Sequence, residues 1–433
     1  MSSKIKAAGA MGDSTTAQVP KLRFPAFRGS DAWEPTTIGA LGRFYYGKSA
    51  PKWSLTEDAP TPCVRYGELY TKFGPTISET YSRTNTDPEK LRFSKGGEIL
   101  IPRVGEKPED FGKCCAYLPL KGIAIGEMIS VLETKQHPLF YTYYFRNLHK
   151  QFAKVVEGQN VKNLYFTELQ PIPIHLPTLA EQKKIAECLS FVDELIAGQS
   201  YTVNTLKTHK KGLMQQLFPR DGETQPRLRF HQFQNQGEWE EKTLEGLAKR
   251  SSGHTPSKSH PEYYNGGIKW VSLADSKRLD CGLISDTSIE ISEKGIQNSS
   301  AVLHPEGTVL ISRDAGVGKS AIMSTPMAVS QHFIVWTCKP SLLSNWFLYY
   351  LLQNSKPLFE RAATGSTIKT IGLQFFKDLV FRVPVLLEQQ RIANCLSDLD
   401  DLIDAHTRKL EVLKTHKKGL MQQLFPTSME MDA

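Results

Sequence analysis

The segment GVGKS, residues 316–320, combines glycines with a lysine and a serine that could bind a nucleotide phosphate. The phosphate-loop motif also requires a glycine five residues before Gly318, but this chain has Arg313 there. We therefore reject a nucleotide site. Residues 310–320 instead predict a strand followed by a basic loop, in which Gly316 and Gly318 would let backbone N–H groups approach a phosphate.

Two further loops carry side chains that could bind a polyanion. Residues 251–275 mix small hydroxyl donors with lysines and aromatic residues, and residues 64–85 mix arginine, lysine, tyrosine and asparagine. Serine, threonine, lysine and arginine donate hydrogen bonds to phosphates, while arginine can bind guanine and asparagine can bind adenine. For Trp270 we expect a place in the core. The candidate binding residues are Arg65, Tyr70, Lys72, Ser82, Arg83, Asn85, Ser251, Ser252, Thr255, Lys258, Arg313, Lys319, Ser320, Ser366 and Lys369.

The sequence contains none of the motifs that mark common catalytic centres. HExxH, GxSxG and GxGxxG are absent, and so is the Asn-Pro-Pro-aromatic motif of amino-methyltransferases. The seven cysteines form no CxxC pair and no Cys/His cluster with zinc spacing. We therefore expect no catalytic site, no metal and no cofactor on this chain.

Length and charge narrow the class of protein. A chain of 433 residues predicts two domains, and its net charge of +8 favours a polyanionic partner. Apolar stretches such as residues 346–352 are far shorter than the roughly 20 residues that span a bilayer, so we expect no membrane segment. The odd number of cysteines fits the reducing cytoplasm, where we place the protein. Residues 1–19 are rich in Ser, Ala, Gly and Thr and predict a disordered tail.

The strongest signal in the sequence is an internal duplication. Residues 177–219 align without gaps on residues 384–426 at an offset of 207, and 26 of these 43 positions are identical. A second match joins residues 20–34 to residues 226–240 at an offset of 206. Each copy therefore begins and ends alike.

The interiors of the two copies differ. Residues 45–159 and 251–366 share only scattered features, such as the similarity of residues 157–164 to residues 364–371. A duplication that keeps its edges and changes its interiors suggests a shared scaffold that presents two different recognition surfaces. Neutral drift in two halves of one enzyme would also produce this pattern, and the sequence leaves that alternative open.

The repeated ends predict two long helices, because apolar residues recur at the alternating 4,3 spacing of a coiled coil. A polar residue interrupts this seam at the same two places in each copy, at Gln199 and Lys210 in the first and at His406 and Lys417 in the second. The apolar seam residues are Ile185, Leu189, Val192, Ile196, Val203, Leu206, Leu213 and Leu217, and then Ile392, Leu396, Leu399, Ile403, Leu410, Leu413, Leu420 and Leu424.

The ends of the helices also have sequence signals. Thr178 and Glu181 have the spacing of a capping box at the start of the first helix, whereas Val385 occupies the matching place in the second and cannot cap it. Pro219 and Pro426 predict where the two helices end.

Charge favours an antiparallel helix pair. Aspartates gather early in the second helix and lysines gather late in the first, and these parts face each other only if the helices run in opposite directions. Two similar antiparallel helices create a pseudo-two-fold axis, which would place the variable regions at opposite ends of a rod of about 55–60 Å. Packing of each helix on its own domain is the alternative. The charged residues are Asp398, Asp400, Asp401 and Asp404 against Lys207, Lys210 and Lys211.

Several of these features together resemble the specificity subunit family of type I restriction-modification systems. They are the duplicated layout, the LMQQLFP helix ends, the Glu-Gln pairs at 181–182 and 388–389, and the SGHTP and GSTIK segments. The similarity covers nearly the whole chain after the tail. The first copy departs from the pattern, because it has GQNVK where the second has GSTIK and because its residues 64–85 lack a GxTP motif.

The resemblance implies an α/β protein with two target-recognition domains, related by duplication and separated by two long antiparallel coiled-coil helices. Each domain would recognise half of a split site in double-stranded DNA, and the helices would set the spacing. Two methyltransferase subunits that bind S-adenosylmethionine would dock on the helices. Restriction subunits that use ATP and Mg would complete the complex.

The implied domain boundaries follow the repeat. The recognition domains would cover residues 20–175 and 220–382, and the helical regions would cover residues 176–219 and 383–426, with tails at 1–19 and 427–433. Two other functions stay open from the sequence. One is a self-contained DNA methyltransferase or nuclease, and the other is a coiled-coil scaffold that does not bind DNA.

Overall fold

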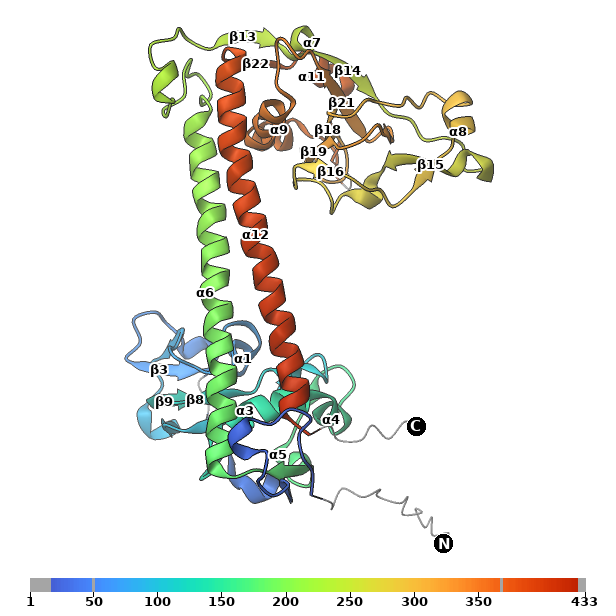
Figure 1. Cartoon of the computed structure of the whole chain (residues 1–433). Helices are drawn as coiled ribbons and strands as arrows, with labels where there is room; N and C mark the ends of the chain where they lie inside the picture. The colour runs from blue at the N-terminus through green and yellow to red at the C-terminus, as the bar shows by residue number, and fades with distance from the viewer. Residues whose placement is uncertain (1–16, 49–50, 367–368, 427–433) are drawn as a thin grey trace. The chain divides into compact units, whose positions relative to one another are not determined.

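The computed structural model describes residues 17–48, 51–366 and 369–426, which belong to two compact units (Figure 1). Unit 1 contains the described residues up to Gln199 and from Lys409 onward, and unit 2 contains residues 200–408. The predicted tails at 1–16 and 427–433 lie outside the described residues. Gln18, expected in the tail, exchanges backbone hydrogen bonds with Trp33 at 3.2 and 2.7 Å. Unit 1 thus includes residues before the predicted boundary.

Two four-stranded sheets form the centre of unit 1. The first is antiparallel, in the spatial order β2 (Gly42–Tyr46), β10 (Ile129–Thr134), β6 (Glu98–Pro102) and β8 (Ala116–Leu118). The second contains a parallel central pair, in the order β4 (Ser82–Thr84), β3 (Thr61–Val64), β9 (Lys121–Ile125) and β5 (Phe93–Lys95). Two short pairs complete the strands, β1 (Glu34–Thr37) with β12 (Pro173–Leu176) and β7 (Val104–Gly105) with β11 (Lys162–Asn163). The short helices are α1 (Tyr66–Thr71), α2 (Asp110–Lys113), α3 (Pro138–Asn147), α4 (His149–Lys154) and α5 (Phe166–Leu169).

Unit 2 has a larger central sheet. Its five strands lie in the order β14 (Ala248–Ser252), β21 (Phe333–Cys338), β18 (Val309–Ser312), β19 (Ser320–Met323) and β16 (Leu283–Ile284). A three-stranded sheet has the order β17 (Glu290–Ile291), β15 (Tyr264–Val271) and β20 (Ala328–Val329), and β13 (Glu240–Thr243) pairs with β22 (Val380–Val383). The short helices are α7 (Leu244–Leu247), α8 (Glu293–Gln297), α9 (Asn345–Asn354), α10 (Lys356–Ala362) and α11 (Leu373–Lys377).

The two units repeat one topology even where their sequences differ. The strand order β2-β10-β6-β8 of unit 1 matches β14-β21-β18-β19 of unit 2, and the parallel pair β3 and β9 matches the parallel pair β15 and β20. The central strands β6 and β18 are mostly apolar, apart from Glu98 and Ser312 at their ends, and are buried along their whole length, as strands covered on both faces must be. The variable interiors therefore keep a shared scaffold, as the pattern of the duplication suggests.

The two long helices are α6 (Leu179–Leu217) and α12 (Leu386–Leu424). In unit 2, Lys210 late in α6 contacts Asp400 early in α12, with 2.5 Å between Nζ and Oδ1. In unit 1, Asp193 early in α6 contacts Lys417 late in α12, also at 2.5 Å. Within each unit the helices thus run in opposite directions, which confirms the predicted antiparallel pair (Figure 1).

Each unit also takes part of its core from the helix of the other copy. Phe425, at the end of α12, is buried in unit 1 and stacks on Tyr144 with 5.0 Å between ring centroids. Phe218, at the end of α6, is buried in unit 2 and packs against Phe347 at 5.5 Å. The start of each helix meanwhile packs on its own domain, as Ile185 does in unit 1. Both predicted arrangements are therefore present: the helices pair with each other, and each also packs on its own domain.

The seam residues of both helices face inward. All of those named above are buried or half-buried, including the polar Lys210 and Lys417. Each of these lysines completes a three-residue cluster. In unit 1, Tyr143 donates a hydrogen bond to Asp193 at 2.7 Å, and Lys417 lies over the Tyr143 ring. In unit 2, Tyr350 donates to Asp400 at 2.8 Å, and Lys210 lies over the Tyr350 ring. Burial lowers the pKa of Lys417, although the adjacent Asp193 partly counters that shift. The two lysine interruptions of the seam, Lys210 and Lys417, thus form matched ion pairs, which fix the register of the helices.

A buried ion pair anchors the start of each helix. The Arg23 guanidinium binds both carboxylate oxygens of Glu181 at 2.8 Å, and Arg229 binds Glu388 in the same way. The predicted capping box forms only in part. The Glu181 N–H donates to the Thr178 hydroxyl at 3.3 Å, but the Glu181 carboxylate is bound by Arg23 instead of turning back to the cap.

We expect Glu388→Gln to destabilise unit 2 strongly. Glu388 is 1% exposed and Arg229 is 7% exposed, so the substitution leaves a buried guanidinium without its counter-charge, at a cost of about 3–5 kcal/mol. Urea unfolding measures the loss. The matched control is Glu109→Gln, which removes a surface partner of Lys113 and should cost less than about 1 kcal/mol. Equal losses for the two variants would show that the buried pair does not anchor the helix.

Candidate nucleic-acid interface

The candidate residues of the first variable region surround helix α1. Arg65 precedes α1, and its N–H donates to the Glu68 carboxylate at 2.8 Å, which also accepts a hydrogen bond from the Ser82 hydroxyl at 2.7 Å. The Arg83 guanidinium is tied to the carbonyls of Ala59 and Pro60. Glu68 and Arg83 therefore stabilise the conformation of the chain around α1.

Three other candidates of this region have different surroundings. Lys72 and Asn85 are exposed, and Lys72 lies over the ring of Tyr81 at 5.6 Å. Tyr70 packs edge-on against Phe111, and its hydroxyl donates to the Val104 carbonyl at 3.1 Å. Because this hydroxyl is already bonded and half-buried, Tyr70 supports the fold rather than a ligand.

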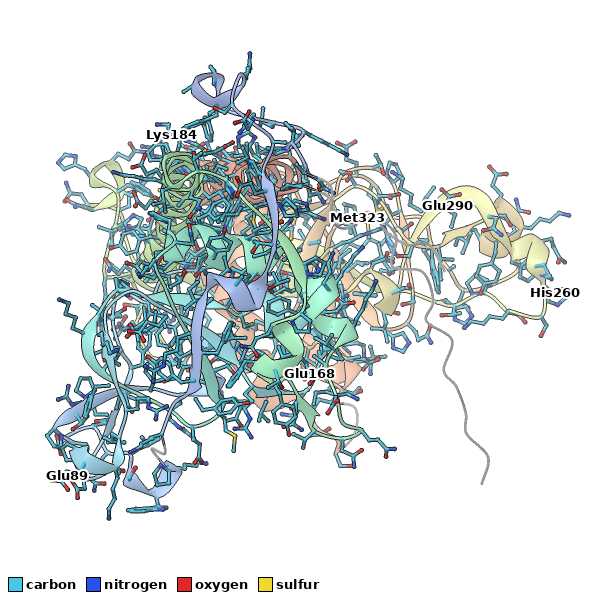
Figure 2. The ribbon with its side chains drawn as sticks, turned by 90° about the horizontal axis from the view of Figure 1, so that it is seen from below. Glu89, Glu168, Lys184, His260, Glu290 and Met323 are labelled. Carbon is cyan, nitrogen blue, oxygen red and sulfur yellow. The ribbon has the colours of Figure 1, made fainter. Side chains whose placement is uncertain are left out.

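In the second variable region the candidates lie around the end of β14. Ser251 and Ser252 close this strand, the Thr255 hydroxyl donates to Gln331, and Lys258 is exposed beyond them. These residues precede an outlying part of unit 2 formed by β15, β17 and α8. Figure 2 shows His260 and Glu290 in this outlying part, away from Met323 of the central sheet.

The GVGKS segment forms a loop between two strands of one sheet. β18 precedes it and β19 follows it, so no helix begins where a phosphate loop would need one. Lys319 donates to the carbonyl and hydroxyl of Ser276 at 3.0 and 3.2 Å. Ser320 is fully buried in β19, and its hydroxyl accepts a hydrogen bond from Gln353 at 2.7 Å. In this structure the Ser320 side chain is thus enclosed by the fold and bonded within it.

The remaining candidates both lie in unit 2, in a segment that has an equivalent in unit 1. Ser366 and Lys369 are exposed in a turn that Thr364 and Thr370 close with backbone hydrogen bonds of 3.0 and 2.8 Å, while residues 367–368 lie outside the described residues. In unit 1 the corresponding turn, GQNVK, is closed by Glu157 and Asn163 in the same manner. The two different sequences are thus closed at their described ends by the same pair of backbone hydrogen bonds.

The structure corrects the alignment of the two variable regions. The His254 N–H donates to the Val329 carbonyl at 3.0 Å, and Lys48 donates in the same way to Ile125 at 2.9 Å. A Cβ on the preceding Gly47 or Gly253 would lie about 2 Å from a carbonyl oxygen, so both positions need glycine. The counterpart of SGHTP therefore begins at Tyr46, and not within residues 64–85. The offset of 206 that joins residues 20–34 to residues 226–240 also pairs Gly47 with Gly253.

This corrected loop leads to an exposed aromatic residue that the sequence did not single out. Trp53 lies in a short 3₁₀ turn (Lys52–Ser54) and is 80% exposed. The neighbouring Lys52 lines a small pocket together with Arg65. An exposed tryptophan that follows a lysine in the chain has the chemistry of a nucleic-acid contact, since its ring can stack on a base while the lysine binds phosphate.

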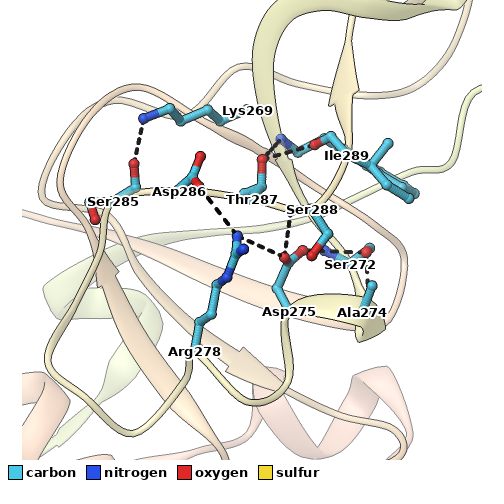
Figure 3. A network of polar contacts seen from close by, with 11 residues as sticks. Lys269, Ser272, Ala274, Asp275, Arg278, Ser285, Asp286, Thr287, Ser288 and Ile289 are labelled. Carbon is cyan, nitrogen blue, oxygen red and sulfur yellow. Dashed lines mark hydrogen bonds and ion pairs between the residues drawn. The ribbon is translucent and has the colours of Figure 1, made fainter. Parts of the chain in front are cut away.

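One buried carboxylate organises the base of the outlying part of unit 2 (Figure 3). Asp275 is fully buried and accepts hydrogen bonds from the N–H groups of Ser288 at 2.7 Å and Ser272 at 3.0 Å. Arg278 lies between Asp275 and Asp286, at 3.4 and 3.7 Å. The Lys269 ammonium binds the carbonyl of Ser285. The network thus joins β15 to the segment 285–289.

We expect Asp275→Ala to release the segment 285–289 without unfolding unit 2. A hydrogen bond to a charged group contributes about 1.5–3 kcal/mol, so the amide hydrogens of Ser288 and Ser272 should exchange roughly ten- to a hundredfold faster. Hydrogen-exchange mass spectrometry measures this change. Asp286→Ala is the control, because Asp286 is 71% exposed and its carboxylate forms an ion pair with the same Arg278 at 3.7 Å. Unchanged exchange in the Asp275 variant would contradict its organising role.

Two negative findings apply to the described ranges. No helix in them is both long and apolar enough to cross a membrane. No group of three or more His, Cys, Asp and Glu side chains in them could hold a metal ion.

Two α/β units of one topology, each with its own loops on a common scaffold, define a duplicated recognition protein. The model for the type I restriction modification DNA specificity domain matches residues 31–205 and 236–415. The chain belongs to this family, the specificity subunits of type I restriction-modification systems, which are recognition and not catalytic subunits.

Individual relatives agree with this family. The type I restriction enzyme MjaIX specificity subunit of Methanocaldococcus jannaschii is 30% identical over 190 residues, 43% of this chain and 44% of that protein. The MjaVIII specificity subunit of the same organism is 23% identical over 412 residues, 90% of this chain and 92% of that protein. The solved S subunit from M. genitalium shares the fold, with a TM-score of 0.61 at 17% identity, and covers 95% of this chain and 100% of its own.

Proposed function

We propose that this chain is the sequence-specific DNA-binding subunit of a type I restriction-modification complex, and that each variable region recognises one half of a bipartite target. One observation carries the proposal. The two units keep the same central sheet and the same closed turns, but they present different side chains on the loops that surround them. Such a scaffold can recognise two different half-sites with one architecture.

The surroundings of the shared sheet support this division of roles. Beside it, unit 1 has the four-stranded sheet around β3, whereas unit 2 has the three-stranded sheet around β15. Base recognition needs side chains that differ between the domains, while contacts with the DNA backbone can be shared. We assign the exposed loop residues Lys72, Asn85, Lys258, Ser366 and Lys369 to DNA binding.

The helices supply the other part of the proposal. Both α6 and α12 contribute to both units, so a change in their length would change how far apart the recognition surfaces lie. We assign to them the spacing of the half-sites and the docking of two methyltransferase subunits. Methylation with S-adenosylmethionine and cleavage with ATP and Mg belong to those subunits and to the restriction subunits, in the cytoplasm.

Replacing residues 45–160 by the equivalent segment of a different specificity subunit should change one half of the methylated sequence and leave the other half intact. The reason is that the replaced loops belong to unit 1 alone. Sequencing of the methylated adenines in DNA exposed to the assembled complex gives the result. The matched control replaces residues 251–366 and should change the opposite half. A change of both halves by either replacement would contradict modular recognition.

Insertion of one heptad after both Val203 and Leu410 should lengthen the stretch of unrecognised base pairs between the two half-sites. The sequences of both half-sites should stay the same. These seam residues are equivalent and buried, so the insertion keeps the 4,3 spacing in both helices. Seven residues add about 10 Å, which is about three base pairs at 3.4 Å per step. The same methylation assay measures the gap. An unchanged gap in an active complex would show that the helices do not set the spacing.

A further inference from the structure

One arginine occupies the same place in both units, directly after the central strand. Arg103 follows β6, and its N–H donates to the Met128 carbonyl while its own carbonyl accepts from the Leu164 N–H, at 2.9 and 2.8 Å. Arg313 follows β18 and makes the same two backbone hydrogen bonds, with His332 and Ile371, at 2.9 and 3.0 Å. Their offset of 210 differs from that of the helices, so the fixed-offset alignment does not pair them.

Both guanidinium groups lack a hydrogen-bond acceptor within the described part of the chain. The Nε atoms of Arg103 and Arg313 are buried and have no hydrogen-bond partner. The Arg103 guanidinium lies between the rings of Tyr46 and Tyr165, 4.7 and 5.3 Å from their centroids. These rings hold the plane of the charged group but accept no conventional hydrogen bond from it.

The second unit differs in one respect. Asp314 lies beside Arg313, with 3.8 Å between its Oδ1 and the arginine Nε, which is too long for a hydrogen bond. The other oxygen of Asp314 is 2.7 Å from His332 Nδ1. The Asp314 carboxylate is therefore directed to His332, and it accepts no hydrogen bond from the Arg313 guanidinium.

Unsatisfied donors on a partly buried cation are costly. Both arginines are only half-buried, so their terminal N–H groups, which also have no acceptor among the described residues, can meet an external one. Each arginine is also joined through its backbone carbonyl to a segment that carries a lysine. Lys162 of unit 1 is half-buried and its Nζ donates to the Gly158 carbonyl at 2.7 Å, whereas Lys369 of unit 2 is exposed. A planar guanidinium with a lysine nearby matches a phosphate group, which offers several acceptor oxygens and a negative charge.

We propose that Arg103 and Arg313 each bind a phosphate of the DNA backbone and so position the two recognition domains on the duplex. This inference rests on the proposed function. The identity of the residue in both units favours phosphate over base, because a contact that is the same in two domains cannot distinguish two different half-sites. Sequence recognition then belongs to the loops that differ.

The test measures the salt dependence of DNA binding by the full chain, with one duplex of arbitrary sequence and one duplex selected from a random library. Arg103→Gln and Arg313→Gln should each weaken binding of both duplexes by the same factor. Each should also lower the slope of log K against log salt by about 0.9, the value for one phosphate contact, and the double variant by about 1.8. Arg103→Lys, which keeps the charge and loses the planar fork, should retain the slope.

Arg361→Gln is the matched control, since Arg361 is 67% exposed and pairs with Asp221 in unit 2. It should leave the slope unchanged. Thermal unfolding identifies any variant that weakens binding only by unfolding. A normal slope in the folded glutamine variants would overturn the proposal, and so would a loss confined to the selected duplex, which would indicate a base contact. If the wild-type chain itself selected no sequence, the proposed function would fail instead.

Discussion

Neither recognition domain can complete its core with its own copy of the repeat, and the rest of the structure depends on this constraint. Phe425 fills the core of unit 1 between Phe140 and Tyr144, and Phe218 fills the core of unit 2 beside Trp239 and Phe347. Burial of one such side chain contributes about 1.5–3 kcal/mol. The end of the other helix thus stabilises the core of each unit.

The same constraint explains where the duplicated sequences agree most. The identical run LKTHKKGLMQQLFP forms the end of each helix. It must pack along its partner helix, place Lys210 or Lys417 beside an aspartate, and insert a phenylalanine into the other domain. A substitution there disturbs two interfaces at once, whereas a substitution in a recognition loop disturbs neither. Scaffold and recognition surfaces can therefore change at different rates.

The helices were predictable from the sequence because their signal is periodic and free of gaps. Heptad spacing, the acidic and basic halves and the closing prolines predict two antiparallel helices, and the structure has them at 179–217 and 386–424. The common topology of the variable regions was not predictable in this way. Insertions change the offset from 206 at Gly47 to 210 at Arg103, so a fixed-offset alignment loses the equivalence between the units.

The candidate site was predictable only in its general chemistry. Serine and tyrosine are suitable for binding DNA, but they serve equally well in a core. Ser320 and Tyr70 lie within the fold because their hydroxyl groups meet Gln353 and the Val104 carbonyl. Arg103 could not be identified as a candidate from the sequence, because the rings that contact its guanidinium belong to Tyr46 and Tyr165, which are distant in sequence. Which polar side chains stay available depends on tertiary contacts that local sequence does not specify.

The central claim is that one chain recognises two separate blocks of DNA sequence, and selection from a random duplex library tests it most directly. The full chain is incubated with the library, and the duplexes that it retains are sequenced. We predict two short conserved blocks of different sequence, separated by a gap of constant length in which every base is tolerated. A single uninterrupted block, or no enrichment of any sequence by the folded chain, would contradict the account.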